Sequence, residues 1–493
     1  MGVQLSRGVE LTLPSRKLVS ICATALLVFS FAACGTRAAG PAKSTTLTTI
    51  HVGKTVTSVQ PSNTTTRGNV TPRPHDMAPE VVDFVSANQG WVAGSDGIEV
   101  TTDGGATWSN QLADPRQVGF RELDFVDPHH GWAVQDDATV ISTADGGGHW
   151  HVVPINELSA LLAKASKGMG GVSSLFLEVD FVDADNGYLL VGSLPDANSL
   201  SELLRTNDGG ATWTRIPLSS VISTGLSNED ASLGYGGGSM PFCFATTEIG
   251  WMAVSGSGSG DTILYGTNDG GLQWSSQVTL PESTIQGSLN SSTGGSVACT
   301  PSDPSVAWYL ADGQPGMSQM SYSLYVTTTG GPKWQAVVNR PTGAGTGPAF
   351  PGQFSPQPGV EAGPGGSPVA IIDTGGNSAL LAGTADALSI EPPYAGSGPL
   401  SVISTSDAGR SWLVPPSGPQ GLPSNVPGVA QFDSDTSSSL PIDMGGFSFS
   451  FPLETTGFVL GPSDTPGADG AAALIETRDS GITWQSVHVF PAS

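Results

Sequence analysis

A six-residue pattern that recurs seven times constrains the fold of this chain more than any other feature. Six copies begin with Asp, contain at least one glycine and end with Trp. A seventh copy, which ends at Trp334, has Thr329 in place of the Asp. The complete copies are bounded by Asp103 and Trp108, Asp145 and Trp150, Asp208 and Trp213, Asp269 and Trp274, Asp407 and Trp412, and Asp479 and Trp484.

Each copy predicts a tight turn between two β-strands. The Asp carboxylate can accept hydrogen bonds from the backbone N–H groups just ahead of it, which closes the turn. The glycines supply the positive φ angles that a side chain would penalise. The Trp then begins the returning strand and buries its ring against the sheet. Extended stretches such as residues 97–102 and 472–477 lead into the turns.

A second pattern lies upstream of most copies and predicts a further strand, turn and strand. Its clearest forms are residues 82–93 and 123–134, in which a Val or Leu, an Asp and a Phe precede a Gly-Trp pair. Weaker forms are residues 179–188, 242–251, 297–308 and 447–458. The sixth unit has no clear match, and we place its strands at residues 369–372 and 379–382. The two patterns account for all 11 Trp residues. We therefore expect most of these rings in blade cores, with sugar stacking by one or two as the alternative.

Four strands in each of seven units predict an all-β fold, a single seven-bladed β-propeller with four-stranded antiparallel blades over residues 79–493. The turn motif resembles the Asp box, also called the BNR repeat. This repeat occurs in sialidases, glucan hydrolases, sortilin-type receptors and photosystem II assembly factors. The Gly-Trp spacing before the box is most similar to the last family, and this resemblance implies a non-catalytic propeller.

The N-terminus is typical of an exported protein. Arg16 and Lys17 precede an apolar run over residues 18–33 that is shorter than a bilayer span, so residues 1–33 are predicted to be a signal peptide. The Ala-Ala-Cys ending resembles a bacterial lipobox and implies diacylation of Cys34, although Phe31 departs from the usual Leu. An ordinary cleavage site is the alternative. We expect anchoring on the extracytoplasmic face of the cell membrane, or secretion if Cys34 is not lipidated.

Residues 34–78 are rich in Thr, Ser, Gly, Pro and Asn and are predicted to be a flexible tether, in which residues 47–56 are the one candidate strand. Beyond Cys22 and Cys34, the only cysteines are Cys243 and Cys299. Both fall on first strands of adjacent units, so an exported chain can join them in a disulfide. Two buried thiols are the alternative.

Charge and motif content exclude several functions. The chain has 18 Lys and Arg against 43 Asp and Glu, a net charge of −25, which argues against nucleic acid and against electrostatic binding to anionic lipid. No HExxH motif, P-loop or nucleophile elbow occurs, and we expect no cofactor and no metal site. Residues 183–187 are a candidate calcium site, but their spacing does not match the usual calcium-binding loop.

Catalytic candidates are few. A sialidase-like site needs several arginines, and Arg121 is better explained as the start of a strand than as a substrate clamp. Glu178, Asp180, Asp183 and Asp185 cluster in sequence, but residues 183–187 occupy a turn position that other units also fill. We therefore assign no catalytic residue.

The expected connectivity places function on one face. The Asp boxes join third and fourth strands, so links to the next blade emerge on the opposite face. The longest links are there: residues 152–174 (with a short helix expected at 158–167), 216–240, 279–296, 337–367 and 414–446. Long loops on a rigid scaffold favour binding. We expect a monomer that binds a protein or glycan through this face; the runner-up is a secreted glycoside hydrolase.

Overall fold

The computed structural model describes residues 79–95, 97–114, 117–156, 175–193, 201–216, 218, 241–255, 262–280, 294–316, 319–340, 368–384, 397–398, 400–413, 432–433, 447–463 and 471–491. The predictions for the signal peptide, Cys34, the tether, the strand at 47–56 and the helix at 158–167 lie outside these ranges. The domain boundaries at residues 33 and 78 stay predictions. Within the described ranges, no helix is both long enough and apolar enough to cross a membrane.

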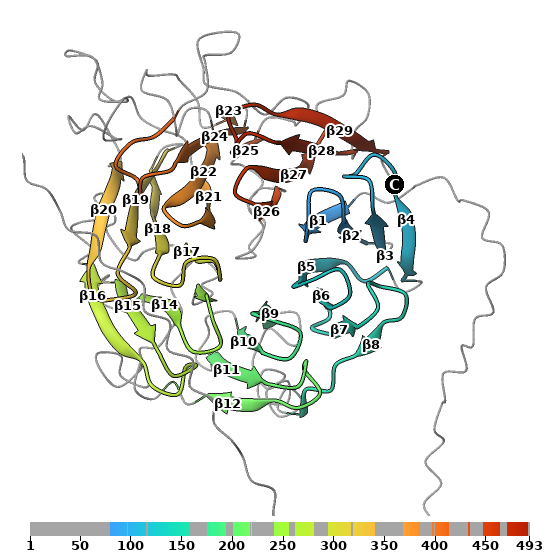
Figure 1. Ribbon diagram of the computed structural model, residues 1–493, viewed down its shortest axis with the longest axis horizontal. Helices are drawn as coiled ribbons and strands as arrows, with labels where there is room; N and C mark the ends of the chain where they lie inside the picture. Colours follow the sequence, from blue (N-terminus) through green and yellow to red (C-terminus); the bar gives the residue numbers. More distant parts are fainter. Residues whose placement is uncertain are drawn as a thin grey trace, which may run out of the picture. The chain divides into compact units, whose positions relative to one another are not determined.

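Seven antiparallel sheets surround a common centre, which confirms the predicted seven-bladed propeller (Figure 1). Blade 1 contains β1 (Pro79–Phe84), β2 (Gly90–Gly94), β3 (Gly97–Thr101) and β4 (Ser109–Ala113); blade 2 contains β5 (Phe120–Phe125), β6 (Gly131–Gln135), β7 (Val140–Thr143) and β8 (His151–Val152); blade 3 contains β9 (Leu175–Phe181), β10 (Gly187–Ser193), β11 (Ser201–Thr206) and β12 (Thr214–Ile216); blade 4 contains β13 (Phe242–Phe244), β14 (Gly250–Ser255), β15 (Thr262–Thr267) and β16 (Ser275–Leu280).

The remaining blades follow the same order, with one exception in blade 6. Blade 5 contains β17 (Gly294–Ala298), β18 (Ala307–Gly316), β19 (Gln319–Thr327) and β20 (Trp334–Arg340); blade 6 contains β21 (Pro368–Gly375), β22 (Ser378–Thr384) and β24 (Leu400–Thr405); blade 7 contains β26 (Ser448–Leu453), β27 (Thr456–Pro462), β28 (Ala472–Thr477) and β29 (Gln485–Phe490). In blade 6 a single bridge between Ser404 and Leu413 takes the place of the fourth strand. The strands placed at residues 369–372 and 379–382 are confirmed as β21 and β22. A two-stranded sheet pairs β23 (Ser397–Gly398) with β25 (Phe432–Asp433).

Each blade is built from consecutive segments, so the ring is closed without a strand exchanged between the two ends of the chain. Among the strands labelled in Figure 1, the first strands β1, β5, β9, β17, β21 and β26 lie nearest the centre of their blades' ring. Between blades 7 and 1, Val82 N–H donates to Ser448 Oγ at 3.1 Å and Phe84 N–H donates to Ser450 Oγ at 2.8 Å. The ring therefore closes through side-chain acceptors and packing.

Aromatic stacks fill four of the seams between blades. At the seam between blades 2 and 3, the Phe181 ring lies flat on Trp132, with centroids 3.4 Å apart. Because Phe181 also lies over Gly187 of its own blade, a Cβ on that glycine would overlap the ring. The equivalent stacks are Trp91 on Phe125, Tyr188 on Phe244 and Phe458 on Phe84.

The Gly of the Gly-Trp pattern is therefore required by the packing of the Phe ring. Two blades have neither the Phe nor the Gly. Blade 6 has Asp373 where the Phe would stand, and Ala379 opposite it. In blade 5 Cys299 follows Ala298, the partner of Trp308, and the Gly position is Ala307. In no blade whose two residues are described does an aromatic ring at the Phe position stand opposite a residue with a Cβ at the Gly position.

The tryptophans lie inside the blades, as the repeat predicts. Nine are buried, whereas Trp150 and Trp334 are half-buried. No Trp is fully exposed.

Candidate functional site

In each complete Asp box, the Asp carboxylate finds its hydrogen-bond partners within the box and at the Thr just before it. In blade 3, Asp208 Oδ1 accepts from Thr212 N–H at 2.7 Å, and Oδ2 accepts from the Thr212 hydroxyl at 2.6 Å. The Thr206 hydroxyl donates to Asp208 Oδ1 at 2.9 Å and accepts from Gly210 N–H at 2.9 Å. Gly209 and Gly210 have φ of 67° and 92°, the left-handed region that the glycines were expected to supply.

The same arrangement recurs in the other complete boxes. The carboxylate accepts the backbone N–H four residues ahead in the boxes of Asp103, Asp145, Asp269, Asp407 and Asp479. In Asp103 the Thr107 hydroxyl is the main group that holds the carboxyl pKa below its usual range. In Asp145 the His149 ring takes that role and lowers the pKa to about 2. The incomplete fifth box has no carboxylate, and Thr327 Oγ1 donates to Gly331 O at 2.9 Å.

The sequence reasoning missed the threonine that stands two residues before the first box position in every copy. These residues are Thr101, Thr143, Thr206, Thr267, Thr327, Thr405 and Thr477. In the six complete boxes each hydroxyl accepts a backbone N–H of the turn. The signal was available, because the position is Thr in all seven copies.

Replacing Thr206 with Val should lower the free energy of unfolding by about 1–3 kcal/mol, because the buried Gly210 N–H loses its acceptor while the shape of the side chain is kept. Thr206 is itself buried. Urea unfolding followed by circular dichroism measures the loss. The matched control is Thr206→Ser, which keeps the hydroxyl and should lose less. An equal loss in both variants would contradict the role of the hydroxyl.

The boxes share one face with the turns between first and second strands. In blade 1, Gly104 N–H donates to Asn88 O at 2.9 Å, and each of the other six blades has the equivalent bond. Since consecutive strands are antiparallel, the connections from second to third strands and from fourth strands to the next blade leave from the opposite face. All residues between 79 and 491 outside the described ranges belong to these opposite-face connections.

Five half-buried carboxyl groups gather around the hub of blades 1 to 3. Asp83 of β1 accepts from Phe125 N–H at 2.6 Å, and Asp180 of β9 accepts from Phe244 N–H at 2.7 Å. Each bond crosses to the next blade. The members of the group are Asp83, Glu122, Asp124, Glu178 and Asp180. Three of the strand patterns quoted from the sequence contain an Asp, but nothing in them showed that the side chains meet.

Burial makes all five hub carboxyls harder to ionise. It raises the pKa of Asp83 to about 6, that of Asp180 to about 7 and, with the Asp180 charge, that of Glu178 to about 8. The pKa values of Glu122 and Asp124 are well above the usual range, first through burial and then through neighbouring carboxylates. Perturbed carboxyls of this kind are a common feature of functional sites.

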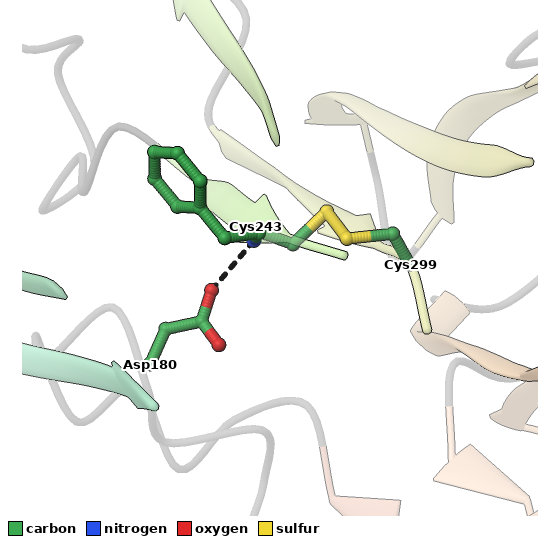
Figure 2. Close-up of a disulfide and its surroundings, with 4 residues drawn as sticks. Asp180, Cys243 and Cys299 are labelled. Atoms are coloured by element: carbon green, nitrogen blue, oxygen red, sulfur yellow. Dashed lines mark hydrogen bonds between the residues drawn. A yellow bond between two sulfur atoms is a disulfide. The ribbon is translucent and has the colours of Figure 1, made fainter. Parts of the chain in front are cut away.

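Cys243 and Cys299 form a disulfide between β13 and the residue that follows β17, with Cα atoms 6.1 Å apart (Figure 2). Figure 2 also shows the Asp180 carboxylate reaching the backbone N–H next to Cys243. The bond links blades 4 and 5 at the hub.

The remaining sequence candidates have structural partners. Arg121 lies in β5 and pairs with Asp136 at 3.2 Å. Asp183 accepts the N–H groups of Asp185 and Asn186 in the turn after β9. The sequence cluster is thereby divided, with Glu178 and Asp180 on the inner strand and the other two acids in the turn. In the described part of the chain, no three His, Cys, Asp or Glu residues are placed to hold a metal ion.

Comparison with known proteins gives one family match and several similar solved structures. Residues 115–220 match the family described as "Photosynthesis system II assembly factor YCF48". The chain is a BNR-type β-propeller. No curated protein sequence matches this propeller. Similar solved structures include "YCF48 bound to D1 peptide", with 17% identity, coverage of 75% of this chain and 81% of that chain, and a TM-score of 0.37. YCF48 from Cyanidioschyzon merolae has 18% identity, coverage of 75% and 85%, and a TM-score of 0.39. A GH74 enzyme from Niastella koreensis has 13% identity, coverage of 84% and 66%, and a TM-score of 0.40.

Proposed function

We propose that this propeller is a non-catalytic binding protein that holds a protein partner on the face opposite the Asp boxes. The observation behind the proposal is the division between the two faces. The Asp-box face consists of short turns whose polar groups bond to one another, whereas the long connections all leave from the other face. A rigid ring with variable loops on one side is a common binding architecture. The match to a family of assembly factors supports a protein partner over a glycan.

Deletion of residues 414–446, with a short Gly-Ser linker in their place to span from Leu413 to β26, should leave the ring folded and reduce partner capture at least about tenfold, because a few contacts carry most of the binding energy of an interface. Trp412 of the sixth box and β26 of blade 7 flank this segment and remain. Capture is measured by crosslinking the mature chain to solubilised host membranes and identifying the products by mass spectrometry.

The matched control is Leu272→Ser, which changes a side chain 59% exposed in the fourth Asp box. It should bind as the parent does. Unchanged capture by the deletion, or loss of capture by the control, would contradict the assignment of the face. Retention on immobilised glycans without a protein product would shift the proposal to a glycan partner.

We further propose that the chain works on the extracytoplasmic face of the membrane, held by a lipid on Cys34. The disulfide between Cys243 and Cys299 supports an oxidising compartment. Mass spectrometry of the mature N-terminus tests the anchor: a diacylated cysteine supports it, and an unmodified N-terminus elsewhere contradicts it.

A glycoside hydrolase is the second candidate, because burial and the Asp180 charge raise the pKa of Glu178 to about 8, as a general acid requires. The purified chain should then cleave sialosides or β-glucans, and Glu178→Gln should abolish cleavage. Absence of hydrolysis by the parent chain would eliminate this candidate for those substrates.

A further inference from the structure

One position on the inner strand links each of five blades to the next. We call it the clasp position: its residue pairs with the aromatic residue on the second strand of the same blade and bonds through its side chain to the next blade, which Ala298 opposite Trp308 in blade 5 cannot do. Its members are Asp83 opposite Trp91, Asp124 opposite Trp132, Asp180 opposite Tyr188, Cys243 opposite Trp251 and Ser450 opposite Phe458.

Three chemistries occupy the clasp position. The three Asp side chains accept the N–H of Phe125, Phe181 and Phe244 on the next blade, at 2.6–2.7 Å. Ser450 accepts the N–H of Phe84 in the same way. At the seam between blades 4 and 5 the hydrogen bond is replaced by the disulfide from Cys243. The disulfide is thus the covalent counterpart of a carboxyl clasp.

The carboxyl clasps face one another, and among the described strands packed against them the one positively charged residue is Arg121 of β5. Glu122 and Glu178 lie two residues before Asp124 and Asp180 on the same strands, and Glu122 accepts Val179 N–H at 3.1 Å. The strands packed against β1, β5 and β9 are β2, β6, β10, β13, β26 and β27, none of which has a charged residue.

The other polar neighbours are few. Tyr188 of β10 lies beside Asp180, and Ser450 of β26 donates to Asp83 Oδ1 at 3.1 Å. On β5 itself, Arg121 is paired with Asp136. Glu80, on β1, is exposed. Ionisation of one hub carboxyl therefore raises the cost of ionising the next.

We propose that the hub is a proton-controlled latch, in which the carboxyl clasps keep the seams of blades 1 to 4 closed while protonated and loosen these seams when they ionise. A neutral carboxyl still accepts the amide N–H of the next blade through its carbonyl oxygen. The charged group accepts the same bond but adds repulsion and burial of charge. The seam between blades 4 and 5 stays closed in both states because it is covalent.

The direction of the pH effect follows from proton binding. The pKa of Asp83 rises from 3.8 to about 6, and that of Glu178 rises from 4.5 to about 8. Between about pH 4 and pH 8 the folded chain consequently binds more protons than the unfolded chain, so stability falls as the pH rises. The pKa values of the Asp-box carboxyls of Asp103, Asp145, Asp208, Asp407 and Asp479 are shifted in the opposite direction. Their contribution to stability is lost only in more acidic solution, as for Asp145 with a pKa of about 2.

Thermal unfolding of the whole mature chain from pH 5 to pH 8 tests the latch. We expect the parent Tm to fall by at least about 3 °C over this range. Asp180→Asn keeps the acceptor for Phe244 N–H without the charge and should flatten the profile, as should Asp83→Asn at another seam. The control Asp185→Asn removes an equal charge from an exposed turn position in the same blade and should keep the parent slope.

Amide hydrogen exchange, corrected for its intrinsic pH dependence, locates the effect. Protection of the Phe125, Phe181 and Phe244 amides should fall about tenfold or more between pH 5 and pH 8, and Asp180→Asn should preserve it at Phe244. A parent Tm that is constant or rises with pH would overturn the proposal. So would a control that flattens the profile as much as Asp180→Asn, or a loss of protection spread evenly over all seven blades.

Discussion

Replacing Phe181 with Ala is expected to lower the free energy of unfolding by about 3–5 kcal/mol, as for other large buried aromatics. The ring is buried, lies flat on Trp132 of the preceding blade and meets Trp213 edge-on at 6.1 Å. Its loss opens a cavity at the seam of two blades and removes both aromatic contacts. Urea unfolding of the parent and the variant gives the difference.

The same ring explains the glycine of the Gly-Trp pattern, so the two positions should be energetically coupled. Gly187→Ala alone should cost about 1–3 kcal/mol, because the new Cβ overlaps the Phe181 ring. In the Phe181→Ala background that cost should largely disappear, since the space is then free. A double-mutant cycle measures the coupling.

Blade 5 supplies the control for this cycle. Ala307 stands at its Gly position and Cys299 at its Phe position, so Ala307→Gly relieves no clash and should cost only about 0.5–1 kcal/mol for the freer backbone. If Gly187→Ala costs as much without the Phe181 ring as with it, backbone preference rather than the ring determines the glycine.

Removing the disulfide, with Cys243→Ala and Cys299→Ala together, should lower the free energy of unfolding by about 2–5 kcal/mol. The bond closes a chain segment of 56 residues and replaces the hydrogen-bonded clasp found at other seams. Denaturant midpoints with and without a reducing agent measure the loss. The reductant should shift the parent chain and leave the double variant unchanged; an unshifted parent would contradict a stabilising role.

The clasp can also be restored without a covalent bond. Cys243→Asn in combination with Cys299→Ala places a carbonyl oxygen where Asp180 has one at the preceding seam. It should recover about 0.5–1.5 kcal/mol relative to the double Ala variant, the usual net value of one hydrogen bond. Equal stability of the two variants would show that residue 299 N–H does not use this acceptor.

Features determined over a few neighbouring residues could be predicted from the sequence alone. The Asp, Gly and Trp of each box lie within six residues, and the carboxylate that closes the turn accepts the N–H of a residue within the same box. Seven such turns with strands between them predict seven blades, and even the weak sixth unit was placed correctly. The two cysteines could be paired because the repeat assigned both to first strands of adjacent blades.

Features that depend on contacts between blades were decided by the tertiary structure. The carboxyls of Asp83, Asp124 and Asp180 are separated in sequence by whole blades, and only the packing of blades 1 to 3 side by side makes them neighbours with raised pKa values. Likewise the Gly of the Gly-Trp pattern could be recognised from the sequence, but its physical reason could not. In blade 3 that reason is the Phe181 ring of the same blade, which lies between Gly187 and Trp132 of the preceding blade. A repeat encodes the local geometry of one unit, whereas burial, repulsion and stacking at the hub arise only when the seven units close into a ring.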